Sequence, residues 1–385
     1  MIYKKIKTTL QFLNRHAGDF LLMGLIGLGL RFYRRWQKKR HKISQMEEDI
    51  RPLPPIEQRS TTPLVTLLVA AWNEEAYIEG FLRSFADLDY PNKELILVAG
   101  GSDSTFRMAH QWASPQITVL EQQAGEGKYR ALQRAYRVAH GDIVFLTDAD
   151  CLLNSESFRL MIAPIISGRE RVVTGRIRPL PHQLSNPFVY AQWIKRQFET
   201  MQSNPDRYVS SLMGGNSAIV HSLLEICWAD SSNQPVGEDH YFALCLQKAG
   251  HKIYEVRESY VETRFAESMG EYIQRQSRWH RGWLILNYQF GDQRWRGNML
   301  TLLKSQAMLA MPFFILLFGP IVAVVWLLGW VHFFTPYLFT KLWTEQSEEK
   351  DSVALVSLCQ LMLADFGARA IVLPQLLKSE WRDSW

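Results

Sequence analysis

Four short apolar runs in the first part of the chain alternate with segments of helical periodicity. The apolar runs occupy residues 64–70, 94–99, 117–120 and 143–147, and the helical segments occupy 74–85, 104–112 and 128–139. Continuous apolar runs of this length are typical of strands buried on both faces of a parallel sheet. Strands that alternate with helices therefore predict an α/β fold with a mostly parallel, doubly wound sheet.

Longer apolar stretches flank this α/β pattern. Residues 307–334 contain no Asp, Glu, Lys or Arg and predict a transmembrane helix. A second candidate helix, 353–377, is interrupted by Asp365 and Arg369, which lie four residues apart and could pair. Near the N-terminus, the run 20–30 is shorter and could be a tilted span, a re-entrant hairpin, an interfacial helix or a buried helix.

These patterns divide the chain into four parts. They are an N-terminal membrane-associated segment with a basic cluster, a linker rich in proline and charge, the α/β domain, and a transmembrane region, at residues 1–46, 47–63, 64–299 and 300–385. The loop 341–351 is acidic, whereas the cluster after residue 30 is basic. By the positive-inside rule we expect a multi-pass protein of the cell membrane, with the α/β domain in the cytosol and the acidic loop outside.

The composition narrows the classes of partner. Hydrophobic residues make up 47% of the chain, which argues against a largely disordered protein. The net charge of +5 suggests anionic partners, such as phosphate groups or acidic lipid headgroups. No nucleic-acid-binding motif occurs, so we expect no nucleic acid partner.

Polar residues follow the predicted strands, where an open α/β sheet binds its ligands. Ala71, Asn73 and Glu74 follow the first strand, Asp103 follows the second, and Asp148 and Asp150 follow the fourth. Paired carboxylates repel each other unless a cation joins them, and Mg²⁺ or Mn²⁺ shared with a diphosphate is a natural partner. Two acids one residue apart are common in loops, but their place after a buried strand favours a metal site.

Two further motifs precede helices. Gly125 and Gly127 would let the backbone approach a ligand, and Lys128 at the helix start favours phosphate, although a simple turn is the alternative. Glu238 and Asp239 open a later helix, where the helix terminus stabilises an ionised acid. Asp239 could therefore cap the helix or act as a general base.

A basic and aromatic motif lies on a predicted helix at about residues 269–286. Arg275 and Arg278 are three residues apart and could grip one anionic group. The apolar stripe that includes Trp279 is more often a core or membrane contact than a site.

The set of motifs, in this order and spacing, resembles the family 2 glycosyltransferases, a group similar to cellulose and hyaluronan synthases and ceramide glucosyltransferase. The resemblance extends over about residues 63–291. It implies a GT-A fold, which is Rossmann-like, and a metal-dependent enzyme that uses a nucleotide-sugar donor.

The resemblance also implies roles for matching positions. Asp239 would be the catalytic base, in a motif that it shares with Glu238. Asp148 would contact the nucleotide sugar and, with Asp150, the metal, Mg²⁺ or Mn²⁺. The nucleotide, diphosphate and acceptor would be bound by the remaining motif residues, which are Ala71, Asn73, Glu74, Arg275, Arg278 and Trp279. The family usually has an acidic pair where this chain has Ala99 and Gly100, and Asp103 could substitute for it.

The expected reaction is an inverting transfer of a hexose, from UDP-glucose or UDP-galactose, to a hydroxyl of a membrane lipid. Two or three membrane helices are few for the channel of a processive polysaccharide synthase. Tyr190, Trp193 and Phe198, beside Lys195, could form an interfacial helix that admits the lipid. The alternatives are synthesis of a polysaccharide or lipid-linked oligosaccharide with partner subunits, and a membrane scaffold that only binds nucleotide.

Overall fold

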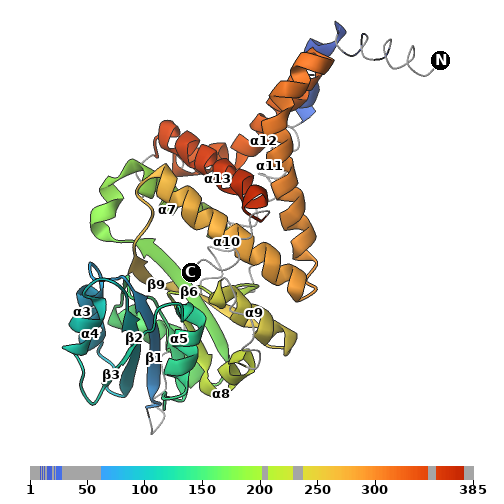
Figure 1. Cartoon of the computed structure of the whole chain (residues 1–385). Coiled ribbons are helices and arrows are strands. Elements are labelled where there is room, and N and C mark those ends of the chain that lie inside the picture. The colour runs from blue at the N-terminus through green and yellow to red at the C-terminus, as the bar shows by residue number, and fades with distance from the viewer. Residues whose placement is uncertain are drawn as a thin grey trace.

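A nine-stranded sheet forms the centre of the computed structural model, and long helices lie along one end of it (Figure 1). The structure describes residues 62–201, 207–228, 237–345 and 353–376, with part of a helix between residues 9 and 27. The basic cluster after residue 30 and most of the 47–63 linker lie outside the described residues.

The first four strands along the main sheet are parallel. They are β1 (Val65–Trp72), β2 (Lys93–Gly100), β3 (Ile117–Glu121) and β4 (Ile143–Leu146), in the order β3-β2-β1-β4. All four residues of β4 are buried, which explains why the sequence shows an apolar run rather than alternation. The α/β prediction is therefore confirmed for this half of the sheet.

Helices cover both faces of this sheet. Leu67 and Phe145 pack on one face with α3 (Ile78–Ala86) and α6 (Ser155–Ile166). Leu68 packs on the other face with side chains of two further helices. These two are α5 (Gly127–Tyr136) and α9 (Glu238–Lys248), while α4 (Thr105–His110) lies between β2 and β3 in the chain. The sheet is thus doubly wound, as predicted.

The second half of the sheet is mixed. Strand β8 (Ser217–Val220) lies antiparallel between β4 and β6 (Val172–Pro179), whereas β6 is parallel to β9 (Ile253–Thr263). Two short strands, β5 (Cys151–Leu152) and β7 (Tyr208–Val209), pair antiparallel with β9. Among the described strands, parallel pairing therefore occurs in β3-β2-β1-β4 and in the β6–β9 pair, and the other pairs are antiparallel.

Three helices near the C-terminus are long and apolar enough to cross a membrane. They are α11 (Arg294–Phe318), α12 (Pro320–Glu345) and α13 (Leu355–Leu376). The prediction of one helix over 307–334 is wrong, because the run divides at Gly319, whose φ of 80° and ψ of −164° are outside the helical region. Pro320 also lacks the N–H that would continue α11.

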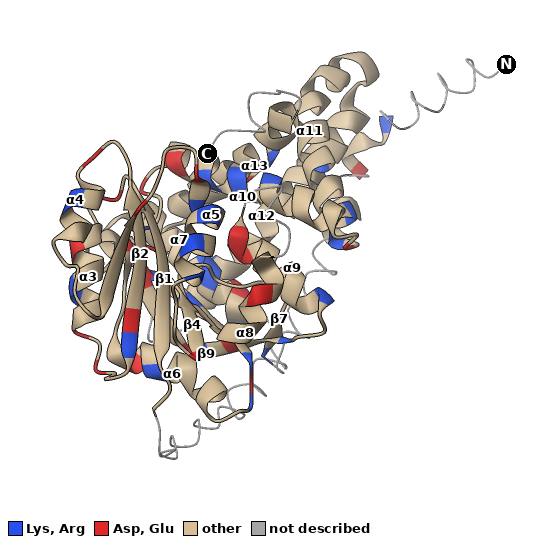
Figure 2. Cartoon of the chain, turned by 60° about the horizontal axis from the view of Figure 1, so that its bottom comes forward, with Lys and Arg blue, Asp and Glu red and all other residues tan. Residues whose placement is uncertain are grey.

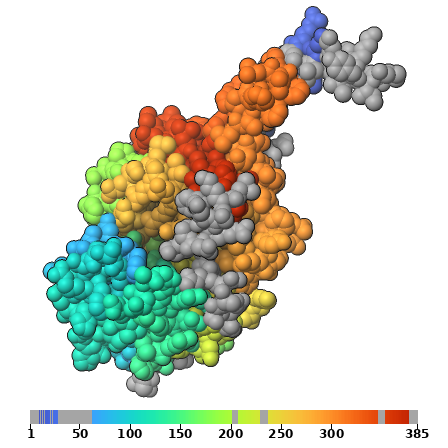
Figure 3. All heavy atoms as spheres, viewed as in Figure 1, coloured from blue at the N-terminus to red at the C-terminus, as the bar shows by residue number. Residues whose placement is uncertain are grey.

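Helices α11 and α12 form a hairpin that projects from the body of the protein (Figure 3). Inside the hairpin the Trp326 indole N–H donates a hydrogen bond to the Met308 carbonyl oxygen at 3.0 Å. Gly24, in the partly described N-terminal helix, lies directly against Leu328 of α12. The described part of the N-terminal helix therefore contacts the hairpin at this glycine.

The end of α12 returns to the α/β domain. The ring of Trp343 lies 5.6 Å from that of Phe198, on α7 (Pro187–Met201), which belongs to the α/β domain. A hydrocarbon core about 30 Å thick cannot separate two rings in contact. The expectation that the 341–351 loop lies on the opposite side from the α/β domain is therefore wrong for its described part, 341–345.

Helix α13 packs along α10 (Met269–Gln289), and 56% of its most apolar 18-residue stretch is buried inside the protein. The predicted pair of Asp365 with Arg369 is present only as an interaction between the two charges, because Asp365 has closer partners. The Asp365 carboxylate accepts a hydrogen bond from the Tyr272 hydroxyl at 2.7 Å and lies 3.5 Å from the Lys195 ammonium. The Arg369 guanidinium lies over the Phe333 ring instead.

Candidate active site

The loops after β1 and β2 are fastened to each other. Asn73, at φ 59°, accepts a hydrogen bond from the Ser102 backbone N–H on its side-chain oxygen at 2.7 Å. A Cβ atom at Gly101 would lie 2.2 Å from this oxygen, so glycine is required there. The Glu74 N–H donates to the Thr105 hydroxyl at 2.7 Å. Asn73 thus shapes the sheet edge where the sequence predicted nucleotide binding.

Asp103 and Ala71 are also used by the fold. Both Asp103 carboxylate oxygens accept backbone hydrogen bonds, from Thr105 at 3.0 Å and Glu75 at 3.1 Å. Slight burial opposes ionisation, but these hydrogen bonds lower the pKa of Asp103. Ala71 is fully buried in the core of the sheet, so only its backbone can border a ligand. Their roles in nucleotide binding stay predictions.

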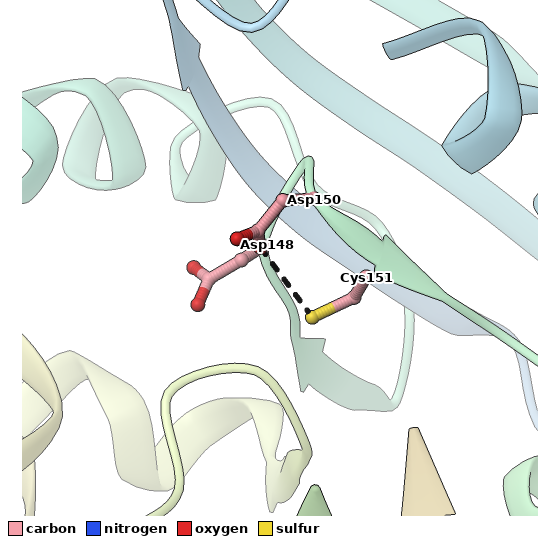
Figure 4. Close-up of side chains that lie close together, drawn as sticks. All are labelled: Asp148, Asp150 and Cys151. Carbon is pink, nitrogen blue, oxygen red and sulfur yellow. Dashed lines mark hydrogen bonds between the residues drawn. The ribbon is translucent and has the colours of Figure 1, made fainter. Parts of the chain in front are cut away.

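Asp148 and Asp150 lie together just beyond β4 (Figure 4). One ligand atom each from Asp148, Asp150 and Cys151 falls within 4.8 Å of the others. Burial, and then the charge of Asp148, raise the pKa of Asp150. A cation would relieve both effects, and the two carboxylates are the hard oxygen ligands that Mg²⁺ and Mn²⁺ prefer. Burial also raises the pKa of the Cys151 thiol well above its usual range, so this sulfur stays a neutral, weak ligand.

Lys128 joins this acidic pair to a distant motif. Its ammonium nitrogen lies 2.6 Å from an Asp148 oxygen and 2.5 Å from a Glu238 oxygen. Burial opposes the charge of Lys128, but the two carboxylates together raise its pKa well above the usual value. Gly125 and Gly127, both with positive φ, form the turn that presents this lysine at the start of α5.

Asp239 lies on the other side of a glycine loop from Asp148. A Cβ atom at Gly215 would lie 3.5 Å from an Asp148 oxygen, and one at Gly214 would lie 3.4 Å from an Asp239 oxygen. Lys128, Gly214, Glu238 and Asp239 also line one small cavity. The carboxylates predicted from separate loops are therefore brought together.

The environment of Asp239 differs from the sequence expectation. Its position at the start of α9 predicts a stabilised carboxylate. In the structure, burial and the neighbouring charge of Glu238 raise the pKa of Asp239, and Lys128 opposes them. Burial outweighs the helix terminus here. A raised pKa suits a group that must accept a proton near neutral pH.

Helix α10 brings two arginines to this edge of the sheet. The Arg275 guanidinium donates to the Arg264 carbonyl oxygen at 2.8 Å, lies over the Trp279 ring, and lowers the pKa of Asp150. Burial lowers the pKa of Arg278, and the nearby charges of Glu238 and Asp148 counter that effect. Figure 2 shows basic and acidic residues gathered where α5, α9 and α10 meet. The predicted basic motif therefore lies beside the acidic one.

Sequence reasoning missed two contributions to the site. Thr263, at the end of β9, pairs with Cys151 and acts to lower the pKa of the neighbouring Asp150, although it is more than a hundred residues away in sequence. Burial and the charges of Asp150 and Asp148 raise the pKa of Glu74 to about 7. Neither effect has a local sequence signal, because each depends on strands or loops that meet only in the fold.

Comparison with known proteins identifies the family. Residues 62–282, more than half of the chain, match the family described as glycosyltransferase like family 2. The chain belongs to this family. The predicted resemblance to family 2 glycosyltransferases is thus confirmed.

Individual relatives are similar to parts of the chain at 22–30% identity. A beta-monoglucosyldiacylglycerol synthase of Trichormus variabilis is 30% identical over 38% of this chain and 31% of its own length. The probable glycosyltransferase YdaM of Bacillus subtilis is 22% identical over 68% of this chain and 61% of its own length. The match thus spans about a third of the length of the first relative.

A solved structure shares the fold over nearly the whole chain. It is the mannosyltransferase PcManGT from Pyrobaculum calidifontis, in complex with GDP-Man and Mn²⁺. The TM-score is 0.56 at 17% identity, and the match covers 94% of this chain and 99% of that one. The fold of this family 2 glycosyltransferase is therefore the GT-A fold, as predicted, with apolar helices added at the C-terminal end.

Proposed function

We propose that this glycosyltransferase transfers a hexose, with inversion, from UDP-glucose or UDP-galactose to a hydroxyl of a membrane lipid at the cytosolic face of the cell membrane. The observation that carries the proposal is the double contact of Lys128 with Asp148 and Glu238. This contact connects the Asp148–Asp150 pair, which suits a metal and the donor, with the Glu238–Asp239 motif, which holds the base. One bound sugar could therefore reach both.

Asp148 and Asp150 would hold Mg²⁺ or Mn²⁺, which when bound would offset negative charge on the donor diphosphate. Asp239 would take the proton of the acceptor hydroxyl as its oxygen attacks the anomeric carbon. The bond from that carbon to the diphosphate breaks on the opposite face, which inverts the configuration. Lys128 and Arg278 would stabilise the negative charge that builds up on the leaving diphosphate.

The acceptor side of the proposal rests on the apolar helices. Between Lys304 and Lys341 the chain contains no Asp, Glu, Lys or Arg, and the tip of the α11–α12 hairpin exposes Phe313, Leu316 and Leu317 to 61–83%. Such a surface suits the hydrocarbon of a bilayer. Both ends of the hairpin lie on the side of the GT-A domain. The name of the Trichormus variabilis relative also supports a diacylglycerol-type acceptor.

Synthesis of a polymer with partner subunits is the second candidate. It is favoured by relatives named poly-beta-1,6-N-acetyl-D-glucosamine synthase, including one of Staphylococcus aureus, which is 30% identical over 26% of this chain. In the described residues only three apolar helices are long enough to cross a membrane, and α13 is half buried in the protein. This number favours transfer of a single sugar over a channel for a growing polymer.

The test is transfer of radiolabelled sugar in native membranes that contain the full chain. Membranes are incubated with a panel of UDP- and GDP-sugars and a divalent metal, and then extracted for lipid. We expect label in a glycolipid with the wild type and almost none with Asp239→Asn. Label in a polymer would favour the second candidate, and nucleotide binding without any transfer would contradict both.

A further inference from the structure

One carboxylate at the membrane end of the protein has no part in the proposed chemistry. Asp365, in the middle of α13, is only 4% exposed. It accepts hydrogen bonds from the hydroxyls of Tyr272, on α10, and Tyr337, on α12. The Lys195 ammonium, on α7, lies 3.5 Å away. Asp365 thus contacts three helices besides its own.

A buried charge is costly unless partners surround it. Each of its three partners comes from a different helix, so the cost is offset only when all of these helices are in place together. Tyr272 and Tyr337 are themselves 8% and 3% exposed, which holds both hydroxyls at this point. The cluster of Asp365, Tyr272, Tyr337 and Lys195 therefore fixes the relative placement of α7, α10, α12 and α13.

This buried cluster lies about one helical turn from Arg275 and about two turns from Arg278 on α10. Tyr272 precedes Arg275 by three residues on α10, and the two side chains are attached to successive turns. The Arg275 guanidinium donates to the Arg264 carbonyl oxygen, and its charge acts on Asp150. A rotation or slide of α10 would move Arg275 and Arg278 away from the acidic pair.

We infer that Asp365 is a positioning residue for sugar transfer. By holding the Tyr272 hydroxyl, it sets the rotation and register of α10 and so the place of Arg275 and Arg278 at the donor diphosphate. Tyr337, on α12, donates to the same carboxylate and so ties α12 to α13 without holding α10. The inference rests on the proposed function, because it assigns these arginines to the donor.

Two tyrosines that donate to the same carboxylate provide a matched test. Tyr272→Phe removes the bond from Asp365 to α10, whereas Tyr337→Phe removes the bond to α12 and leaves α10 held. We expect Tyr272→Phe to raise the donor KM about tenfold, within the range that a small misplacement of binding groups produces. We expect Tyr337→Phe to change the donor KM less than about twofold, with a similar loss of thermal stability, since each loses one buried hydrogen bond.

The measurements are donor KM with UDP-glucose or UDP-galactose and Mn²⁺-dependent UDP binding, on the full chain in membranes or lipid nanodiscs. Equal donor KM values in the two variants, with equal losses of stability, would show a purely structural role and overturn the inference. If Tyr272→Phe does not fold, Asp365→Asn, which weakens the bond to α10 as well as the bond to α12, is compared with Tyr337→Phe in the same way. A wild type that binds UDP and transfers nothing would instead contradict the proposed function.

Discussion

The two halves of the sheet are built in different ways. In β3-β2-β1-β4, each strand is followed by its own short connection, and the helices α3, α5 and α6, which are near in sequence, cover the two faces together with α9 from further along the chain. In the second half, β8 lies between β4 and β6, and β9 pairs with β6, β5 and β7. The first half is thus assembled from neighbours in sequence, and the second from segments that are far apart.

The proposed chemistry divides along the same line. The acidic pair and Lys128 belong to the first half, whereas Asp239, Arg275 and Arg278 arrive from α9 and α10 in the second. Lys128 and Glu238 make the contact across the boundary at 2.5 Å. We infer that the first half binds the metal and the donor, and that the second half adds Arg275 and Arg278 at the donor diphosphate and supplies the base and the acceptor side.

The largest expected effect separates reaction from binding. Asp239→Asn should reduce transfer by about 10²–10⁴-fold, the usual contribution of a positioned general base. Mn²⁺-dependent UDP binding should remain within about twofold, because the donor ligands in the first half are intact. Initial transfer rates and a UDP binding titration measure the two quantities.

The control for that substitution is Asp87→Asn, at an exposed helix end far from the acidic pair in the chain, which should leave both quantities unchanged. A parallel loss of UDP binding and transfer in Asp239→Asn would contradict the division of labour between the halves.

The same division explains how much of the molecule the sequence predicts. The apolar run of β4 and the acids that follow it are adjacent in sequence, so both the strand and the Asp148–Asp150 pair could be found from local pattern. The motifs at Lys128 and Asp239 could be found as helix starts, but their contact through Glu238 follows from the packing of α5 and α9 on one sheet face.

The second half could not be predicted in the same way. Strand β9 pairs with β5 and β6, and nothing local in the sequence indicates that Thr263 will meet Asp150. In the helices, spacing alone suggested Arg369 as partner of Asp365, whereas the fold places Lys195 there from a helix far away in sequence. The apolar run 307–334 hid the turn at Gly319, because hydropathy does not report backbone conformation.

The next effect tests the metal site of the first half. Asp150→Ala should abolish the Mn²⁺ dependence of UDP binding and reduce transfer about 10²-fold, because charge stabilisation by a metal contributes several kcal/mol. Cys151→Ser is the matched variant in the same cluster and should keep the metal affinity, since its buried thiol is neutral. Metal affinity is measured by titration of Mn²⁺ with UDP present.

A strong loss of Mn²⁺ affinity in Cys151→Ser would show that sulfur ligates the metal. Unchanged affinity in Asp150→Ala would instead place the metal elsewhere and remove the basis for assigning donor binding to this half.

A smaller effect comes from pH. Because burial and Glu238 raise the pKa of Asp239, the base is protonated at a pH where an ordinary aspartic acid is ionised. The transfer rate should therefore fall as pH decreases through that raised pKa, by up to about tenfold per pH unit. Glu238→Gln removes a charge that raises this pKa, so its falling limb should lie at lower pH. Transfer rates at saturating donor across pH 5–9 measure the acidic limb of the wild type and of the variant. A limb at higher pH in Glu238→Gln would contradict the assignment of Asp239 as the base.

The smallest effect on chemistry is expected from a substitution in the hairpin. It tests whether the apolar helices can be destabilised without loss of donor binding in the first half of the sheet. Gly319 adopts φ 80° and ψ −164°, a region that is essentially restricted to glycine. Gly319→Ala should therefore cost about 1–3 kcal/mol of stability. Thermal unfolding in lipid nanodiscs measures this loss, while Mn²⁺-dependent UDP binding at temperatures below the transition should change less than about twofold.

A glycine-to-alanine substitution ten residues further on provides a control, because we expect it to increase stability. Gly329 lies inside α12, where an added Cβ atom would meet the Met308 side chain at 3.6 Å, an ordinary contact distance. Gly329→Ala should thus gain about 0.5–1 kcal/mol, because alanine favours the helix over the unfolded chain. If Gly319→Ala removed UDP binding while the GT-A domain stayed folded, the hairpin would take part in donor binding, which would contradict the assignment of donor binding to the sheet.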